Sequence, residues 1–119
     1  NILRLHNDVY HYIMDDNRLN IWKWLQESNN LMDISRENKL CKHAAINKCY
    51  KVLKWLVKND CHIDFETVSF CIQNNNYDIF EWLLKRVPDL KYDINQPYIH
   101  NSILNAKDSR FQDWYLHNV

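Results

Sequence analysis

Apolar residues recur along the chain with the spacing of short amphipathic helices. Tyr50, Leu53, Leu56 and Val57 follow one another at intervals that place them on one side of a helix. Lysines fall on the opposite side of this stretch, and a second apolar stripe runs through residues 37–46 just before it. The pattern predicts a pair of short helices joined by a tight turn.

The same pattern returns about every thirty residues. Its members share a tryptophan preceded by an apolar pair ten and eleven residues earlier, and the tryptophans are Trp24, Trp55, Trp82 and Trp114, spaced by 31, 27 and 32 residues. A helix pair this short buries its apolar face only by stacking on a neighbour. We therefore expect an all-α solenoid of about four stacked helix-turn-helix repeats, forming one domain over residues 1–119. The units are expected at roughly 5–34, 35–64, 65–95 and 96–119.

The regular register of these tryptophans predicts that they pack between units. Trp22 breaks the register, so we expect it to be partly exposed. The turns between helices are rich in asparagine, as at Asn47 and in residues 74–76. Because asparagine tolerates the left-handed backbone conformation better than most residues, it can take the place of glycine, which the chain lacks.

Residues 44–61 carry the most specific pattern. Their sequence, AAINKCYKVLKWLVKNDC, resembles the second half of an ankyrin repeat, AAxNGHLEVVKLLLxxGA. It is closer still to the divergent ankyrin repeats of large DNA viruses of amoebae, in which VLKW and an NGC turn recur. Lys48 and Asp60 stand where the family has its two glycines, and the TPLH signature of the family is absent from every unit.

The resemblance implies a non-enzymatic protein–protein interaction module, part of a longer array, that presents a preformed concave surface. It also implies a viral protein that acts on a host protein inside the cell, in the cytoplasm. No cofactor, metal, small-molecule substrate or membrane partner is expected. In such arrays the partner meets the loops between units and the outer faces of the first helices. The partner-binding residues that this implies are Asn29, Asn30, Lys39, Lys42, His43, Asp60, His62, Asp64 and Glu66.

Composition and charge exclude several classes of binding site. A chain of 119 residues without glycine cannot contain a glycine-rich phosphate loop or a dinucleotide-binding fingerprint. The formal net charge is zero, which argues against a dedicated nucleic-acid binder. Residues 36–58 nevertheless carry a net charge of +6 between flanks of −2 and −4. Such a bipolar surface would steer a complementary protein partner and suppress wrong ones.

Two other hypotheses remain open at this point. Thiol and imidazole side chains suggest zinc, but no C-x-x-C spacing occurs and the repeat register separates them: Cys41, His43, Cys49, Cys61, His62 and Cys71. The R-x6-H pairs Arg36/His43 and Arg110/His117 resemble the signature of HEPN-type ribonucleases. An RNA-binding or RNA-cleaving helical domain is therefore the alternative function. Its RNA contacts would lie on the basic segment of residues 36–58, at Lys39, Lys42, Lys48 and Lys51.

Overall fold

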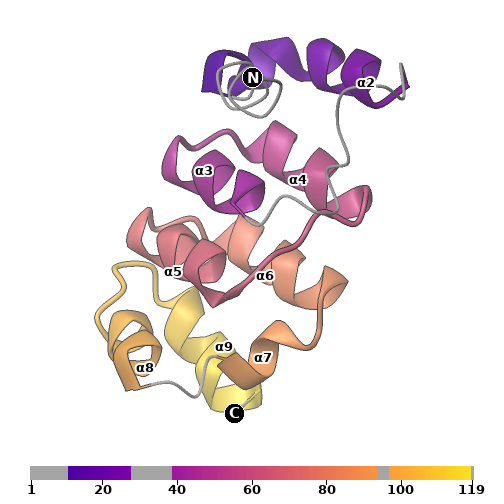
Figure 1. Cartoon of the computed structure of the whole chain (residues 1–119). Helices are drawn as coiled ribbons and strands as arrows, with labels where there is room; N and C mark the ends of the chain where they lie inside the picture. The colour runs from indigo at the N-terminus through magenta and orange to yellow at the C-terminus, as the bar shows by residue number, and fades with distance from the viewer. Residues whose placement is uncertain (1–10, 28–38, 94–96, 119) are drawn as a thin grey trace. The chain divides into compact units, whose positions relative to one another are not determined.

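The computed structural model describes residues 11–27, 39–93 and 97–118, and every regular element in these ranges is a helix (Figure 1). In chain order the elements are η1 (Asp16–Arg18), α2 (Leu19–Glu27), α3 (Leu40–Ile46), α4 (Tyr50–Lys58), α5 (Phe65–Gln73), α6 (Tyr77–Arg86), α7 (Leu90–Asp93), α8 (Pro97–Leu104) and α9 (Arg110–Asn118). The all-α prediction is confirmed for the described residues. By its internal contacts the chain divides into two compact units, Asn1–Ile63 and Asp64–Val119.

The first unit is built on the α3–α4 hairpin, with η1 and α2 packed on α4. Its core consists of side chains that are almost completely removed from water: Ile13, Trp22, Leu25, Leu40, Cys41, Ala44, Ala45, Val52, Leu53, Leu56 and Val57. The amino end of α4 has no side-chain cap from its own flanking residue, Cys49. Instead Asp16 Oδ1 in η1 accepts a hydrogen bond from the Val52 amide at 3.0 Å. A carboxylate is favourable at a helix amino end, so this contact fastens η1 to α4.

The second unit contains two helical hairpins, α5–α6 and α8–α9, and α5 also contacts α8. Aromatic rings join α6 to α9, since the ring centroid of Phe80 lies 5.0 Å from that of Phe111 and 5.1 Å from that of Trp114. Like helices therefore lie together: the first helix of one hairpin contacts the first helix of the other, and the second contacts the second. Phe80 and Phe111 are both fully buried.

Three helices end in the same hydrogen-bonded turn, in which one residue has a left-handed backbone. These residues are Lys48 (φ 58°) after α3, Asp60 (φ 65°) after α4 and Asn75 (φ 57°) after α5. After α3, the Lys48 amide donates to Ala45 O at 3.2 Å and the Cys49 amide donates to Ala44 O at 2.8 Å. The other two turns repeat this pairing, which defines the Schellman motif.

The asparagine prediction is confirmed at Asn75 and wrong at Asn47. Asn47 has φ −88° and the following residue, Lys48, takes the left-handed conformation. The hydrogen-bond pattern of the motif fixes which position becomes left-handed, so residue type alone does not decide it.

The tryptophan prediction is wrong in α2. Trp22 has 0% of its surface exposed, and its indole Nε1 donates to Ile13 O at 2.6 Å. Trp24 is 61% exposed. The two residues are two positions apart on one helix, so their side chains point in nearly opposite directions. Trp55, Trp82 and Trp114 are half-buried, so the tryptophan register marks the flank of the core rather than its centre.

The connection between residues 86 and 97 contains the short helix α7, whose Leu90 is buried. Pro97 is the first residue of α8, a position where the missing amide hydrogen costs nothing. None of the helices in the described parts of the chain combines the length and the apolar character that crossing a membrane requires.

Trp22→Ala should lower the free energy of unfolding by about 3–5 kcal/mol, because it deletes a large buried side chain and leaves a cavity. Trp24→Ala should change it by less than about 0.5 kcal/mol, because the exposed indole has little to lose. Urea denaturation followed by circular dichroism measures both. Equal costs for the two variants would contradict the assignment of Trp22 to the core.

Lys48→Gly and Asp60→Gly should each raise the free energy of unfolding by about 0.5–1 kcal/mol. Glycine removes the steric cost of a side chain in the left-handed region, and part of this gain is offset by its extra freedom when unfolded. Asn47→Gly is the matched control, since Asn47 has a negative φ and its side chain donates to His43 O at 2.8 Å. Urea titration should show this control destabilised, and a loss of stability in all three variants would refute the turn geometry.

Candidate interaction surface

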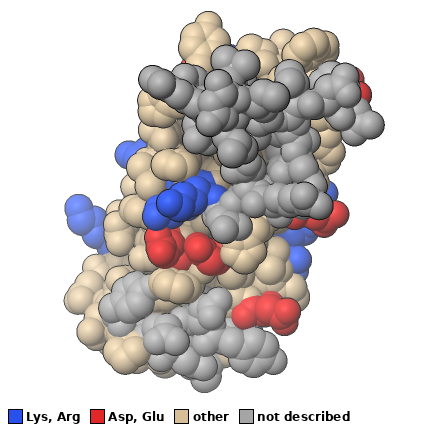
Figure 2. All heavy atoms as spheres, in the orientation of Figure 1, with Lys and Arg blue, Asp and Glu red and all other residues tan. Residues whose placement is uncertain are grey.

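The outward side of α3 forms a narrow stripe that combines positive charge with one apolar residue. The helix buries its other side in the core of the first unit. The residues left outward lie at i, i+3, i+4 and i+7, which is one face of a helix, and are Lys39, Lys42, His43 and Ile46. We call them the α3 stripe. Lys42 is half-buried, the other three are exposed, and Ile46 keeps 41% of its surface in water. Figure 2 shows basic side chains over α3 on the face toward the viewer.

The charges of the α3 stripe oppose the stability of their own helix. Lys39 immediately precedes α3 and Lys42 lies in its first turn, where the helix dipole disfavours positive charge. Lys39 also makes no side-chain cap bond to the helix. Local helix stability therefore does not account for these lysines. Charges placed against the preference of their own helix are expected at functional surfaces.

His43 has a perturbed imidazole. Partial burial is the largest cause that lowers its pKa below 6.5, and the positive charges of Lys42 and Lys39 lower the pKa further, with a smaller effect from His11. The positive charges of the α3 stripe thus add to the effect of burial in disfavouring a proton on His43. A negatively charged partner would oppose the contribution of the lysines.

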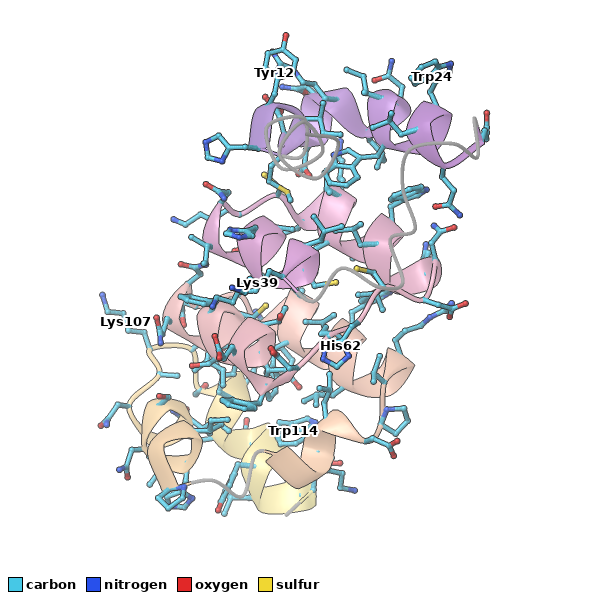
Figure 3. All side chains as sticks on the ribbon, in the orientation of Figure 1. Tyr12, Trp24, Lys39, His62, Lys107 and Trp114 are labelled. Carbon is cyan, nitrogen blue, oxygen red and sulfur yellow. The ribbon has the colours of Figure 1, made fainter. Side chains whose placement is uncertain are left out.

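The remaining predicted residues of the first unit are two asparagines and two residues that follow α4. Asn29 and Asn30 fall outside the described residues. Asp60 and His62 follow α4, and both are exposed. Asp60 is the left-handed residue of the Schellman turn, so its backbone has a structural role while the residue is exposed to solvent. Lys39 and His62 can be located in Figure 3.

Asp64 and Glu66 belong to the second unit, where they begin α5. The Asp64 carboxylate caps this helix, because its Oδ1 accepts hydrogen bonds from the amides of Glu66 at 3.1 Å and Thr67 at 3.4 Å. Capping is worth about 1 kcal/mol, so Asp64 has a structural role that the sequence reasoning did not assign to it. Glu66 is half-buried in the first turn, where its charge suits the helix dipole.

The second unit also contains a groove that the sequence reasoning missed. It has a volume of about 470 Å³ and runs between α6, α7 and α9. On its α6 side Tyr77 Oη donates to Glu81 Oε2 at 2.9 Å and Lys85 Nζ donates to Glu81 Oε1 at 3.3 Å. These bonds lower the pKa of Glu81, with that from Tyr77 the larger cause, and burial together with Glu81 raises the pKa of Tyr77 to about 12. The i, i+4, i+8 spacing of the three residues could have revealed the network in the sequence.

The pair Arg110/His117 lies at opposite ends of α9. The Arg110 guanidinium is held by Asp108 at 2.7 Å and Asp78 at 3.1 Å, and it lies 4.8 Å from the centre of the Tyr77 ring. His117 Nδ1 donates to Asp113 O at 2.6 Å. Both side chains are thus engaged in local contacts of the second unit. Arg36, the first member of the other pair, is outside the described residues.

In the part of the chain that the structure describes, no three His, Cys, Asp or Glu side chains lie close enough together to bind a metal ion. The four cysteines are buried thiols. Burial raises the pKa of the Cys71 thiol to about 12 and also raises that of Cys49. Thiols of this kind are poor nucleophiles, so their arrangement offers packing rather than reactivity.

Comparison of the chain with protein-family models, with characterised proteins and with solved structures gave no match.

The pKa of His43 leads to a pH prediction. The unfolded imidazole binds a proton near pH 6.5, whereas the folded one does so only at lower pH. Folding is therefore disfavoured as the pH falls below 6.5, because the unfolded state binds more protons there. His43→Gln should show a smaller loss of urea stability between pH 7.5 and pH 5 than the parent does. An unchanged pH dependence in the His43 variant would contradict the assignment.

Proposed function

We propose that the chain is an ankyrin-like interaction module whose α3 stripe binds an acidic surface of a protein partner. The observation that carries the proposal is the placement of Lys39, Lys42 and His43 on one outward face of a first helix, next to the exposed side chain of Ile46. Charge complementarity would orient the partner, and the apolar residue would add buried area.

The backbone turns support the ankyrin-like part of the proposal. The two family glycines correspond to Lys48 and Asp60, and both have positive φ. Glycine is favoured at these positions of the family because it adopts a left-handed backbone at no steric cost. In this chain the left-handed turn is present although another residue replaces the glycine. Asn75 is left-handed at the same distance before Trp82 as Lys48 is before Trp55. The agreement of the two hairpins supports a repeated unit.

The packing within each unit supports stacking of such repeats. In the second unit α5 contacts α8, and aromatic rings link α6 to α9. In the first unit α2 contacts α4, and the rings of Trp22 and Trp55 are 6.3 Å apart. Contact between like helices of successive pairs is how a solenoid buries its apolar faces. We extend this arrangement to the whole chain as part of the proposal.

A rigid scaffold would favour binding through the α3 stripe. The apolar side of α3 is buried against α4, so the backbone that carries the stripe is already ordered before a partner arrives. Little conformational entropy is then lost on binding. The viral origin and the host target implied by the ankyrin resemblance remain part of the same proposal.

Charge reversal tests the function. The double variant Lys39→Glu, Lys42→Glu should weaken binding to a captured partner at least tenfold, about 1.4 kcal/mol. Its melting temperature should be unchanged or slightly raised, because acidic residues suit the amino end of α3. The measurement is the dissociation constant for each protein that the immobilised chain retains from an extract, determined by titration at low and at high salt.

The matched control is Lys51→Glu, Lys58→Glu, which makes the same charge change on exposed positions of α4. This variant should bind within a factor of about two of the parent, well below the tenfold effect expected on α3. If the α4 variant loses binding and the α3 variant does not, the surface is misplaced. Specific binding or cleavage of a short single-stranded RNA would favour the RNA hypothesis instead, and anisotropy and gel assays would detect it.

A further inference from the structure

The long walls of the groove in the second unit are α6 and α9, which run in the same direction. Near their amino ends Arg110 Nη1 of α9 lies 3.1 Å from Asp78 Oδ1 of α6. Further along both helices the Trp114 ring lies 5.1 Å from the Phe80 ring. Because the contacts advance toward both carboxyl ends together, residues on the two walls can be matched level by level. The helix α7 follows the carboxyl end of α6 and completes the groove.

Positive and negative charges are separated along this groove. At one level Glu81 of α6 and Asp113 of α9 place a carboxylate on each wall. Four residues later on each helix, about 6 Å along the axis, the lining side chains are Lys85 and His117. Lys91 of α7 adds a second ammonium group beyond the end of α6. We call Glu81 with Asp113 the acidic level, and Lys85 with His117 and Lys91 the basic level.

Both levels have charged groups that can accept a ligand. In the part of the chain that the structure describes, no hydrogen bond or ion pair involves the carboxylate of Asp113 or the ammonium group of Lys91. Glu81 pairs with Lys85 at 3.3 Å, but the two side chains are 40% and 76% exposed. An exposed pair of this kind contributes little energy, so a ligand can share its charges.

The same two helices already hold an arginine one turn before the acidic level. The Arg110 guanidinium contacts the carboxylates of Asp108 at 2.7 Å and Asp78 at 3.1 Å, and it lies 4.8 Å from the centre of the Tyr77 ring. The acidic level offers the same groups, two carboxylates and the half-buried ring of Trp114 (Figure 3), and no arginine is among the side chains that line it. A planar guanidinium suits such a set, because it pairs with carboxylates and stacks on aromatic faces.

We propose that the groove binds an extended peptide segment of a protein partner, with an arginine at the acidic level and an acidic side chain two residues away at the basic level. Alternate side chains of an extended chain point to the same side about 6.6 Å apart, close to the distance between the levels. The groove volume of about 470 Å³ lies within the range usual for ligand sites. Pro88, Lys91 and Asp113 on its rim are exposed, so a chain can enter lengthwise.

Free arginine is a poorer occupant than a peptide. Its guanidinium fits the acidic level, but its α-ammonium group would then lie beside its carboxylate at the basic level, where Lys85 and Lys91 repel it. A peptide backbone carries no such charge. The proposal concerns the second unit alone and does not rest on the α3 stripe.

Two capped peptides of the same composition test the spacing of the charges. AEARAEA has a glutamate two positions from the arginine on either side, so it fits the groove in both chain directions. EAARAAE has its glutamates three positions away, where they point to the opposite side of an extended chain. Calorimetric titration should give EAARAAE a dissociation constant about threefold higher or more, the effect of losing exposed ion pairs.

Substitutions in the protein test the location of the site. Asp113→Asn should weaken the binding of AEARAEA about fivefold or more, because the arginine loses a carboxylate beside Trp114. The peptide AEAQAEA, which lacks the arginine, should bind the parent protein as weakly, and the two changes should not add when combined. Asp89→Asn is the matched control, since Asp89 is exposed in the same unit and does not line the groove. It should bind AEARAEA within about a factor of two of the parent.

Several outcomes would overturn the proposal: equal binding of the two spacings, equal losses from Asp89→Asn and Asp113→Asn, or dissociation constants above about 1 mM for every peptide. Free arginine that competes as well as AEARAEA would also overturn it, because the groove would then recognise a guanidinium alone. The variant Lys39→Glu, Lys42→Glu should bind AEARAEA like the parent. Loss of the peptide in that variant would place it on the α3 stripe, which contradicts the groove site and leaves the proposed function standing.

Discussion

Helices as short as these hold together because each second helix places at least one large side chain completely out of water. Trp22 does this in α2 and Phe80 does it in α6, and each is covered by the tryptophan of a following helix in its own unit. A helix of nine or ten residues has little stability of its own. Tertiary burial therefore decides which segments are helical, and both the turns and the α3 stripe depend on it.

The left-handed turns show which features the sequence predicts and which it does not. The positions of the turns follow from the apolar pattern, but the residue that adopts positive φ follows from backbone hydrogen bonding. Lys48 carries no residue signal for that conformation and Asp60 carries a weak one, because aspartate tolerates it better than most residues. Comparison with the glycine positions of the ankyrin pattern marks both. The same limit explains the wrong prediction for the tryptophans. Tryptophan recurs at Trp24, Trp55 and Trp82, so the sequence draws attention to that position. The buried position lies two residues earlier and holds Trp, Leu and Phe in turn, so no residue type recurs there.

The candidate surface was predictable in part. The helical spacing of Lys39, Lys42 and His43 places them together on one face of α3, as the sequence suggests, and Ile46 extends that face. Asp64 was assigned to binding, but its carboxylate accepts two amide bonds as the cap of α5, and this capping role depends on a helix boundary that spacing alone does not locate. The groove beside Tyr77 needs α6, α7 and α9 together, and no local pattern brings these helices together.

The central claim is that like helices of successive pairs stack through an aromatic contact. A double-mutant cycle on Trp22 and Trp55, with each changed to Leu singly and together, measures this contact most directly by urea denaturation. The account predicts a coupling free energy of about 0.5–1.5 kcal/mol, the usual range for an aromatic pair, and no coupling in the matching cycle on Trp24 and Trp55. Additive effects for Trp22 and Trp55, or equal coupling in both cycles, would contradict it.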